Sequence, residues 1–262
     1  MEISPPIIQS ALAGYTTPSF IQSILDNGAG IATFGGYSLD ELTNEGSTEI
    51  IKRNRKEILL PRNETEFQKW CNLNLNVKKN SDKQLTAINL RISKINQETL
   101  RKINFISSFI DIIELNAHCR QKEIVERRGG EYLLKDINRL DYILEKIRKA
   151  SPKEKKIGIK IRGYVVNDQK KLVNVLESRS VDYLHIDCME PGKPYANLKI
   201  VTSFSKSTDI TLIGNNSVRN VKDVQQMIDA GASAVSIARP LITNPSFIKK
   251  LILECKTKGI LK

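Results

Sequence analysis

Eight short apolar runs, rich in isoleucine and valine, recur along the 262-residue chain with helical patterns between them. Runs of this kind are typical of strands that are buried on both faces of a parallel sheet. They occupy residues 6–13, 29–34, 84–92, 110–116, 156–162, 181–187, 210–214 and 233–238. Eight strand-and-helix units in about 250 residues match the size of a (β/α)8 barrel. The pattern therefore predicts an α/β fold, a (β/α)8 TIM barrel.

Helical patterns fill most of the gaps between the apolar runs. Apolar residues recur at the spacing of a single helix face. Such stripes lie at 140–147, 172–176 and 224–228. Thr17-Pro18 and Asn244-Pro245 each place a capping side chain before a proline, which predicts that a helix starts at each of these sites.

The segment 35–83 is longer than one connecting helix requires. We expect it to be an extended insertion between strands 2 and 3, with two helices at 47–59 and 63–75 that cover the barrel mouth. No other domain is visible in the sequence, so we expect a single domain over residues 1–262. A doubly wound open sheet is the alternative fold, but no G-x-G-x-x-G motif follows the first run.

Several classes of protein are disfavoured by the composition. No apolar run reaches the roughly 18 residues that a membrane span needs, and the N-terminus lacks the pattern of a signal peptide. We therefore expect a cytoplasmic protein with no membrane association. The four cysteines have no CxxC spacing and are expected to be free thiols. With two histidines and no clustered ligands, we expect no metal site.

The net charge is +12, from 41 basic and 29 acidic residues. Such an excess favours attraction to a polyanion such as nucleic acid. The basic residues are spread along the chain, however, and a lysine-rich proteome would give the same total. Both interpretations stay open on charge alone.

Polar residues follow most of the predicted strands, at the end where the chemistry of a TIM barrel is found. The residues at or just after the strand ends are, in strand order, Asn89; Asn116, His118 and Cys119; Lys160 and Arg162; His185 and Asp187; Gly214, Asn215 and Asn216; Ala238 and Arg239. Arg239 would lie beside the phosphate site commonly formed by the loops after strands 7 and 8. A positive charge from Lys160 suits a flavin, which becomes anionic on reduction. These residues predict a cofactor that carries a phosphate.

With these residues located, the chain resembles the tRNA-dihydrouridine synthases, which are FMN-binding TIM-barrel reductases related to dihydroorotate dehydrogenases. The resemblance runs in order from about residue 7 to about residue 250. Its motifs are QSALAGYTTPSF, ELNAHCRQKEIVERRGGEYLLKD, IGIKIRG, YLHID, LIGNNSV and AVSIARPLITNPSFI.

The resemblance implies a reductase of the C5=C6 bond of uridine in RNA, with FMN as cofactor, NAD(P)H as electron donor and tRNA as partner. It places Cys119 as the catalytic general acid and Asn116 as the residue that orients the base, with His118 and Arg162 also on the substrate side. The cofactor residues that it implies are Ala11, Leu12, Ala13, Asn89, Lys160, His185, Gly214, Asn215, Ala238 and Arg239. A protonated His118 would also activate the adjacent Cys119 thiol.

The chain also departs from the family pattern. His118 and Arg120 replace the glycine and proline that flank the cysteine, and Asp187 stands where the family has a basic residue. Asn216 and Ser217 replace a glycine and an acid in the phosphate loop. The barrel is expected to end near residue 252, which leaves no room for the C-terminal helical domain of the family. Two alternatives therefore remain, a dihydroorotate-dehydrogenase-like flavoenzyme acting on a small pyrimidine and a non-catalytic barrel.

Overall fold

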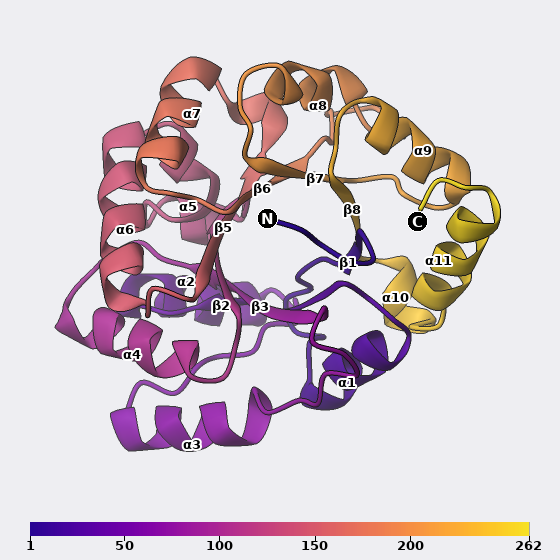
Figure 1. Ribbon diagram of the computed structural model, residues 1–262. Helices are drawn as coiled ribbons and strands as arrows, with labels where there is room; N and C mark the ends of the chain where they lie inside the picture. Colours follow the sequence, from indigo (N-terminus) through magenta and orange to yellow (C-terminus); the bar gives the residue numbers. More distant parts are fainter. Residues whose placement is uncertain (262) are drawn as a thin grey trace.

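Eight parallel strands close into a barrel in the computed structural model, which describes residues 1–261 (Figure 1). Each strand pairs with its neighbour in sequence, and the last pairs with the first. The strands are β1 (Ile7–Gln9), β2 (Ile31–Ser38), β3 (Leu85–Arg91), β4 (Ile112–Ala117), β5 (Lys156–Arg162), β6 (Tyr183–Asp187), β7 (Thr211–Asn215) and β8 (Ala234–Ile237). The predicted TIM barrel is confirmed, and each predicted run overlaps one strand. Residue 262 lies outside the described residues.

Eight helices surround the barrel (Figure 1). They are α1 (Pro18–Asp26), α3 (Glu64–Asn74), α4 (Gln97–Ser107), α6 (Ile137–Ala150), α7 (Gln169–Ser178), α8 (Leu198–Ser205), α9 (Val221–Asp229) and α11 (Phe247–Thr257). The three predicted apolar stripes lie on α6, α7 and α9. The loops contain a further helix, α2 (Glu41–Lys52), and four short elements: α5 (Lys122–Val125), α10 (Pro240–Thr243), and the 3₁₀ helices η1 (Gly130–Leu134) and η2 (Gly163–Val165).

The interior of the barrel is apolar near the start of the strands and polar near their ends. Near the start of the strands, Ile8, Ile31, Ile112 and Ile213 point inward and form a small apolar cluster. Side chains alternate between the two faces of a strand, so residues two positions further on also point inward. At those later positions the interior is polar, and this polar half forms the floor of the site described below.

The insertion between β2 and β3 differs in part from its prediction. The helix expected at 47–59 is α2, which begins after Asp40 and ends at Lys52. It stops there because Asn54 adopts a left-handed conformation with φ of 59°, which an α-helix does not allow. The chain then runs as an irregular segment, residues 53–57.

The second predicted helix is present as α3, but it does not cover the mouth. It lies on the outside of the barrel, beyond α4 (Figure 1). There Trp70 packs edge-on against the ring of Tyr37, with the centroids 5.3 Å apart. The expectation that both helices cover the mouth was therefore wrong.

The two predicted helix starts had different outcomes. Thr17 caps α1 by accepting a hydrogen bond from the backbone N–H of Phe20, as expected. Asn244 is not the N-cap of a helix but the C-cap of α10, and α11 begins three residues later, at Phe247. The Oδ1 atom of Asn244 instead accepts a hydrogen bond from Ser246 Oγ at 2.6 Å. Across residues 1–261 the longest apolar helices fall short of what a membrane span requires.

Candidate active site

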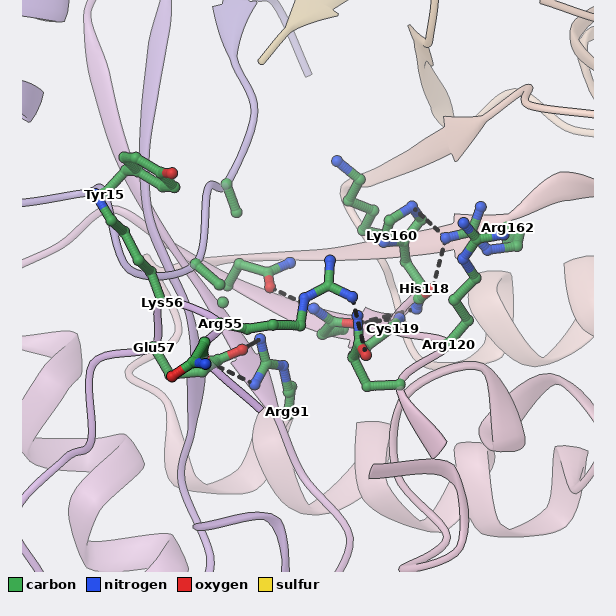
Figure 2. Close-up of a pocket in the computed structure, with 17 residues that line it drawn as sticks. Tyr15, Arg55, Lys56, Glu57, Arg91, His118, Cys119, Arg120, Lys160 and Arg162 are labelled. Atoms are coloured by element: carbon green, nitrogen blue, oxygen red, sulfur yellow. Dashed lines mark hydrogen bonds and ion pairs between the residues drawn. The ribbon is translucent and has the colours of Figure 1, made fainter. Parts of the chain in front are cut away.

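Two adjoining cavities open at the C-terminal end of the barrel. The first has a volume of about 520 Å³ and is lined by Cys119, Asn116 and residues 54–57 of the insertion. We call it the thiol cavity (Figure 2). The second, of about 980 Å³, is lined by the loops that follow β6, β7 and β8, and we call it the loop cavity. Both cavities are lined by Ala11, His118, Arg120, Lys160 and Arg162. Because the cavities adjoin, there is room for a ligand that extends across the mouth.

A continuous chain of buried hydrogen bonds crosses the barrel beneath these cavities. It starts at β7, where Asn215 Nδ2 donates to Ser236 Oγ at 2.6 Å. Ser236 Oγ is 2.7 Å from His185 Nε2, and His185 Nδ1 is 2.8 Å from Glu114 Oε2. Polar side chains from four strands are therefore fixed to one another below the site.

The second half of the chain leads to the thiol. Asn89 Nδ2 donates to Glu114 Oε1 at 2.6 Å, and Asn116 Nδ2 donates to Asn89 Oδ1 at 2.7 Å. Asn116 Oδ1 accepts hydrogen bonds from the backbone N–H groups of His118 at 3.0 Å and Cys119 at 2.8 Å. The orientation of the Cys119 loop is thus tied to the carboxylate at the centre of the barrel.

Glu114 is the central member of this chain, and its side chain is only 1% exposed. It also accepts a hydrogen bond from Tyr183 OH at 2.9 Å. Burial alone would raise the pKa of Glu114, but its interactions with His185, with the ammonium of Lys160 and with the Asn89 amide lower it to about 2. Glu114 is therefore an ionised carboxylate with all its donors in place.

His185 was expected to line the flavin ring, but it lines neither of the two cavities. Burial and the charge of Lys160 lower the pKa of His185, which favours the neutral ring. A neutral ring donates a hydrogen bond from Nδ1 to Glu114 and accepts one at Nε2 from the Ser236 hydroxyl. Both ring nitrogens of His185 therefore have a hydrogen-bond partner. In this structure His185 supports the floor of the site.

Cys119 lies at the wall of the thiol cavity and is 8% exposed. Its loop is held close to η1, because Glu131 N–H donates to the Cys119 carbonyl at 2.9 Å. Gly130 has φ of 58°, and a Cβ there would lie 2.2 Å from the same carbonyl oxygen. Only glycine allows this approach, which explains the second glycine of the Gly-Gly pair that follows the cysteine in the sequence.

The other three cysteines are buried and line neither cavity. Burial raises the pKa of Cys71 and of Cys188 to about 12, and it also raises the pKa of Cys255. Thiols in such surroundings are unreactive. Cys119 is the cysteine that faces a cavity.

His118 and Arg162, both predicted on the substrate side, meet in an ion-pair network. His118 Nε2 is 2.5 Å from Asp187 Oδ2, and Arg162 Nη1 donates to the same oxygen at 3.1 Å. Arg162 Nε also lies 3.3 Å from Glu131. Burial is the main cause that lowers the pKa of His118 to about 4. The ring is directed at Asp187, and activation of the Cys119 thiol by a protonated His118 stays a prediction.

Lys160 lies where the two cavities meet and is buried. Its ammonium group donates a hydrogen bond to Ser10 Oγ. Burial lowers the pKa of Lys160, while the carboxylates of Glu114 and Asp187 oppose that change. An ammonium group has three donors, so two remain after the bond to Ser10.

The residues predicted around the phosphate fall into two groups. Asn215, Ala238 and Arg239 line the loop cavity, and Arg239 is exposed with no ion pair among the described residues. Gly214 does not line it, because a Cβ there would point at Met227 Sδ of α9 at 2.7 Å. Gly214 thus allows close helix packing instead.

The predicted residues of the loop after β1 also differ in whether they line a cavity. Ala11 lines both cavities and Ala13 lines the thiol cavity, whereas Leu12 lines neither. Asn89 lines the thiol cavity with Asn116. Most of the residues expected from the sequence therefore converge on the mouth, and Leu12, His185 and Gly214 support it from behind.

Three parts of the site were not predicted. Glu114 and Arg91 each lie two positions from a predicted inward-facing residue of the same strand, Asn116 and Asn89. The alternation of strand side chains would have found both. Residues 54–57 were missed because they were assigned to a helix.

Arg91 is buried beside the thiol and forms a two-point ion pair with Glu57, at 2.9 and 3.1 Å. Burial would lower the pKa of Arg91, but the charges of Cys119 and Glu57 raise it. Within residues 1–261, no cluster of three or more His, Cys, Asp or Glu side chains is arranged to hold a metal ion.

Comparison with known proteins identifies the sequence relatives of this chain. The family model described as dihydrouridine synthase (Dus) matches residues 74–262. An uncharacterized protein of Methanocaldococcus jannaschii is 33% identical over 256 residues, which cover 97% of this chain and 96% of that protein. The tRNA-dihydrouridine(16) synthase of Pseudomonas syringae is 25% identical over 157 residues. That alignment covers 57% of this chain and 49%, about half, of the Pseudomonas enzyme.

A solved structure is similar in fold. The crystal structure of DHODH from Eimeria tenella, in complex with ferulenol, aligns with a TM-score of 0.67 and 14% identity. The alignment covers 98% of this chain and 82% of that one. At this level of identity the match supports the barrel architecture alone.

Proposed function

The chain belongs to the dihydrouridine synthase family, and from that premise we propose that it is an FMN-dependent oxidoreductase that reduces the C5=C6 bond of uridine in RNA. NAD(P)H is the proposed electron donor and tRNA the proposed partner. The observation that carries the proposal is the thiol cavity, which brings the Cys119 side chain, Asn116 and the buried cation Lys160 to one space. A thiol at a cavity wall is a suitable proton donor to a ring carbon.

The described residues fit FMN. The loop cavity is lined by Arg239, which has no ion pair among the described residues, and by residues 215–218. These groups suit a single phosphate. Lys160 adds a buried positive charge at the junction with the thiol cavity. When bound, FMN would supply the two-electron reduction and would carry negative charge on its phosphate and on its reduced ring.

Each residue near the thiol has a proposed part in the reaction. Cys119 donates the proton from Sγ to one carbon of the pyrimidine double bond. Asn116 has one N–H of its amide left after its bond to Asn89, and this N–H can donate to a carbonyl of the base. Glu114 acts indirectly, because it holds Asn89 and therefore Asn116 in place.

We expect the purified protein to be yellow and to release FMN, not FAD, on denaturation, because the loop cavity offers one phosphate site. Arg239→Ala should weaken FMN binding roughly tenfold or more, the effect expected when a charge-assisted hydrogen bond is removed. Fluorescence titration of the flavin-free protein measures both affinities.

Arg219→Ala is the matched control. Arg219 lines the same cavity, but it is already paired with Asp223 at 3.5 Å, and its removal should change FMN affinity far less. Protein that stays colourless with excess FMN would contradict the proposed function. Unchanged affinity in Arg239→Ala would mean that the phosphate binds elsewhere.

A further inference from the structure

The thiol cavity has a strong excess of positive charge. Its lining includes six cationic side chains and a single carboxylate, that of Glu57. The cationic side chains are Arg55, Lys56, Arg91, Arg120, Lys160 and Arg162. An uncharged pyrimidine ring and a proton donor do not require so many cations, so the distribution of this charge needs an explanation.

Half of these cations are already engaged within the protein. Arg91 is paired with Glu57, and Arg162 is paired with Asp187 and Glu131. Lys160 is buried and bonded to Ser10. These three groups have partners that account for their burial.

Arg55, Lys56 and Arg120 are different, because all three are exposed and none forms an ion pair among the described residues. Arg55 makes only a long hydrogen bond, 3.5 Å, to Gln121 Oε1. The ammonium of Lys56 lies 4.6 Å from the centroid of the Tyr15 ring. Figure 2 shows Arg55 reaching from the inserted segment toward the side of the cavity that carries Cys119.

The segment that carries Arg55 and Lys56 is fixed at both ends. At one end Glu57 pairs with Arg91, and both side chains are only 4% exposed. At the other end Arg53 Nε is 2.6 Å from Glu123. Fixing a loop in advance reduces the entropy that binding would otherwise cost.

The β1 loop supports the same segment from the side. Gly14 has φ of 76°, and a Cβ there would lie 2.6 Å from the carbonyl carbon of Lys56. The two backbones are therefore in direct contact, and only glycine permits it. Residues 54–57 form a fixed wall of the thiol cavity.

We propose that Arg55, Lys56 and Arg120 form an anion subsite that binds a phosphate group attached to the sugar of the pyrimidine substrate. This inference rests on the proposed function, because that function places the pyrimidine against Cys119 in the same cavity. Arginine pairs with phosphate through two parallel hydrogen bonds, and a phosphate carries enough charge to engage more than one cation. Arg55 and Lys56 line only the thiol cavity, whereas Arg239 lines only the loop cavity, and Arg120 lies where the two cavities adjoin.

Calorimetric titration of the FMN-loaded protein with uridine 5′-monophosphate and with uridine tests the subsite. We expect the monophosphate to bind roughly tenfold more tightly, as for a charge-assisted contact. The double variant Arg55→Gln/Lys56→Gln should abolish this preference. The control Arg62→Gln/Lys69→Gln removes two cations of the same insertion that line neither cavity, and it should keep the preference.

A short single-stranded oligonucleotide with one uridine distinguishes a free nucleotide from a nucleotide within RNA. If the phosphate belongs to RNA, the oligonucleotide should bind more tightly than the monophosphate. The logarithm of the oligonucleotide's binding constant should then fall less steeply with the logarithm of salt concentration for the double variant than for the unaltered protein. The slope should differ by about 0.7 for each phosphate that the double variant no longer neutralises. If the free nucleotide is the ligand, the monophosphate should bind at least as tightly as the oligonucleotide. Either result supports the subsite and identifies its source.

The subsite is contradicted if uridine and its monophosphate bind equally to the unaltered protein. It is also contradicted if Arg55→Gln/Lys56→Gln behaves like the control variant toward every probe. The flavin spectrum is recorded in the same samples. Loss of flavin from all forms would contradict the proposed function, whereas retained flavin with no phosphate preference would contradict the subsite alone.

Discussion

Cys119→Ala is expected to retain its flavin while its rate of substrate reduction falls by roughly 10²–10⁴-fold, the usual contribution of general acid catalysis. The thiol lies at the wall of the thiol cavity, whereas the phosphate end of the proposed cofactor site lies in the loop cavity. Reduction of the bound flavin by NADPH should therefore be unaffected. Stopped-flow measurement of the two half-reactions separates flavin reduction from substrate reduction.

The chain provides its own controls for this experiment. Cys71, Cys188 and Cys255 are buried away from both cavities. Their alanine variants, compared at equal folded fraction, should reduce substrate at close to the normal rate. If Cys119→Ala turned over normally while Cys188→Ala did not, the acid would belong to the loop after β6 and the assignment of Cys119 would be wrong.

Glu114→Ala is expected to lower the free energy of unfolding by about 3–5 kcal/mol, the cost of removing one partner from a buried charged network. The substitution leaves Asn89, Tyr183 and His185 without the acceptor that they share. Denaturant unfolding at neutral pH measures the change. Glu126→Ala is the control, since Glu126 is 59% exposed in a surface pair, and its cost should stay within about 0.5 kcal/mol.

The pH dependence of stability gives an independent test of Glu114. Its pKa of about 2 in the folded protein lies below the ordinary value of 4.5. A lowered carboxylate pKa contributes stability above the unfolded pKa, and that stability is lost as the pH falls toward the folded pKa. The stabilisation from this carboxylate is therefore fully present at neutral pH. Glu114→Gln should lack this component of the acid-induced loss, and an unchanged pH profile in that variant would contradict the role of the ionised carboxylate.

The architecture of the barrel was predictable from sequence because each strand is a short apolar run with a helical stripe after it. The insertion was less predictable. Apolar spacing continues through Ile58 and Leu59, but the left-handed conformation of Asn54 ends α2 before them. Such a stop depends on the contacts of residues 53–57 with Glu123, Arg91 and Gly14, which are remote in sequence.

The candidate site was predictable where a side chain follows a strand and faces the mouth, as Cys119, Lys160 and Arg239 do. The site was less predictable where such residues form ion pairs or hydrogen bonds with one another. His118 and Arg162 were assigned to the substrate, yet Asp187 engages both. His185 was assigned to the cofactor, yet Glu114 and Ser236 hold it below the floor. Pairing between strands is decided by three-dimensional proximity, which a single sequence does not give.

The proposed reduction of uridine in RNA can be measured directly. The direct measurement is an anaerobic incubation of the purified FMN-loaded protein with NADPH and an unmodified tRNA transcript, followed by nucleoside mass spectrometry. We predict that dihydrouridine appears with the unaltered protein and not with Cys119→Ala. If the flavin is reduced by NADPH and every uridine of the transcript remains unchanged, the proposed function is contradicted.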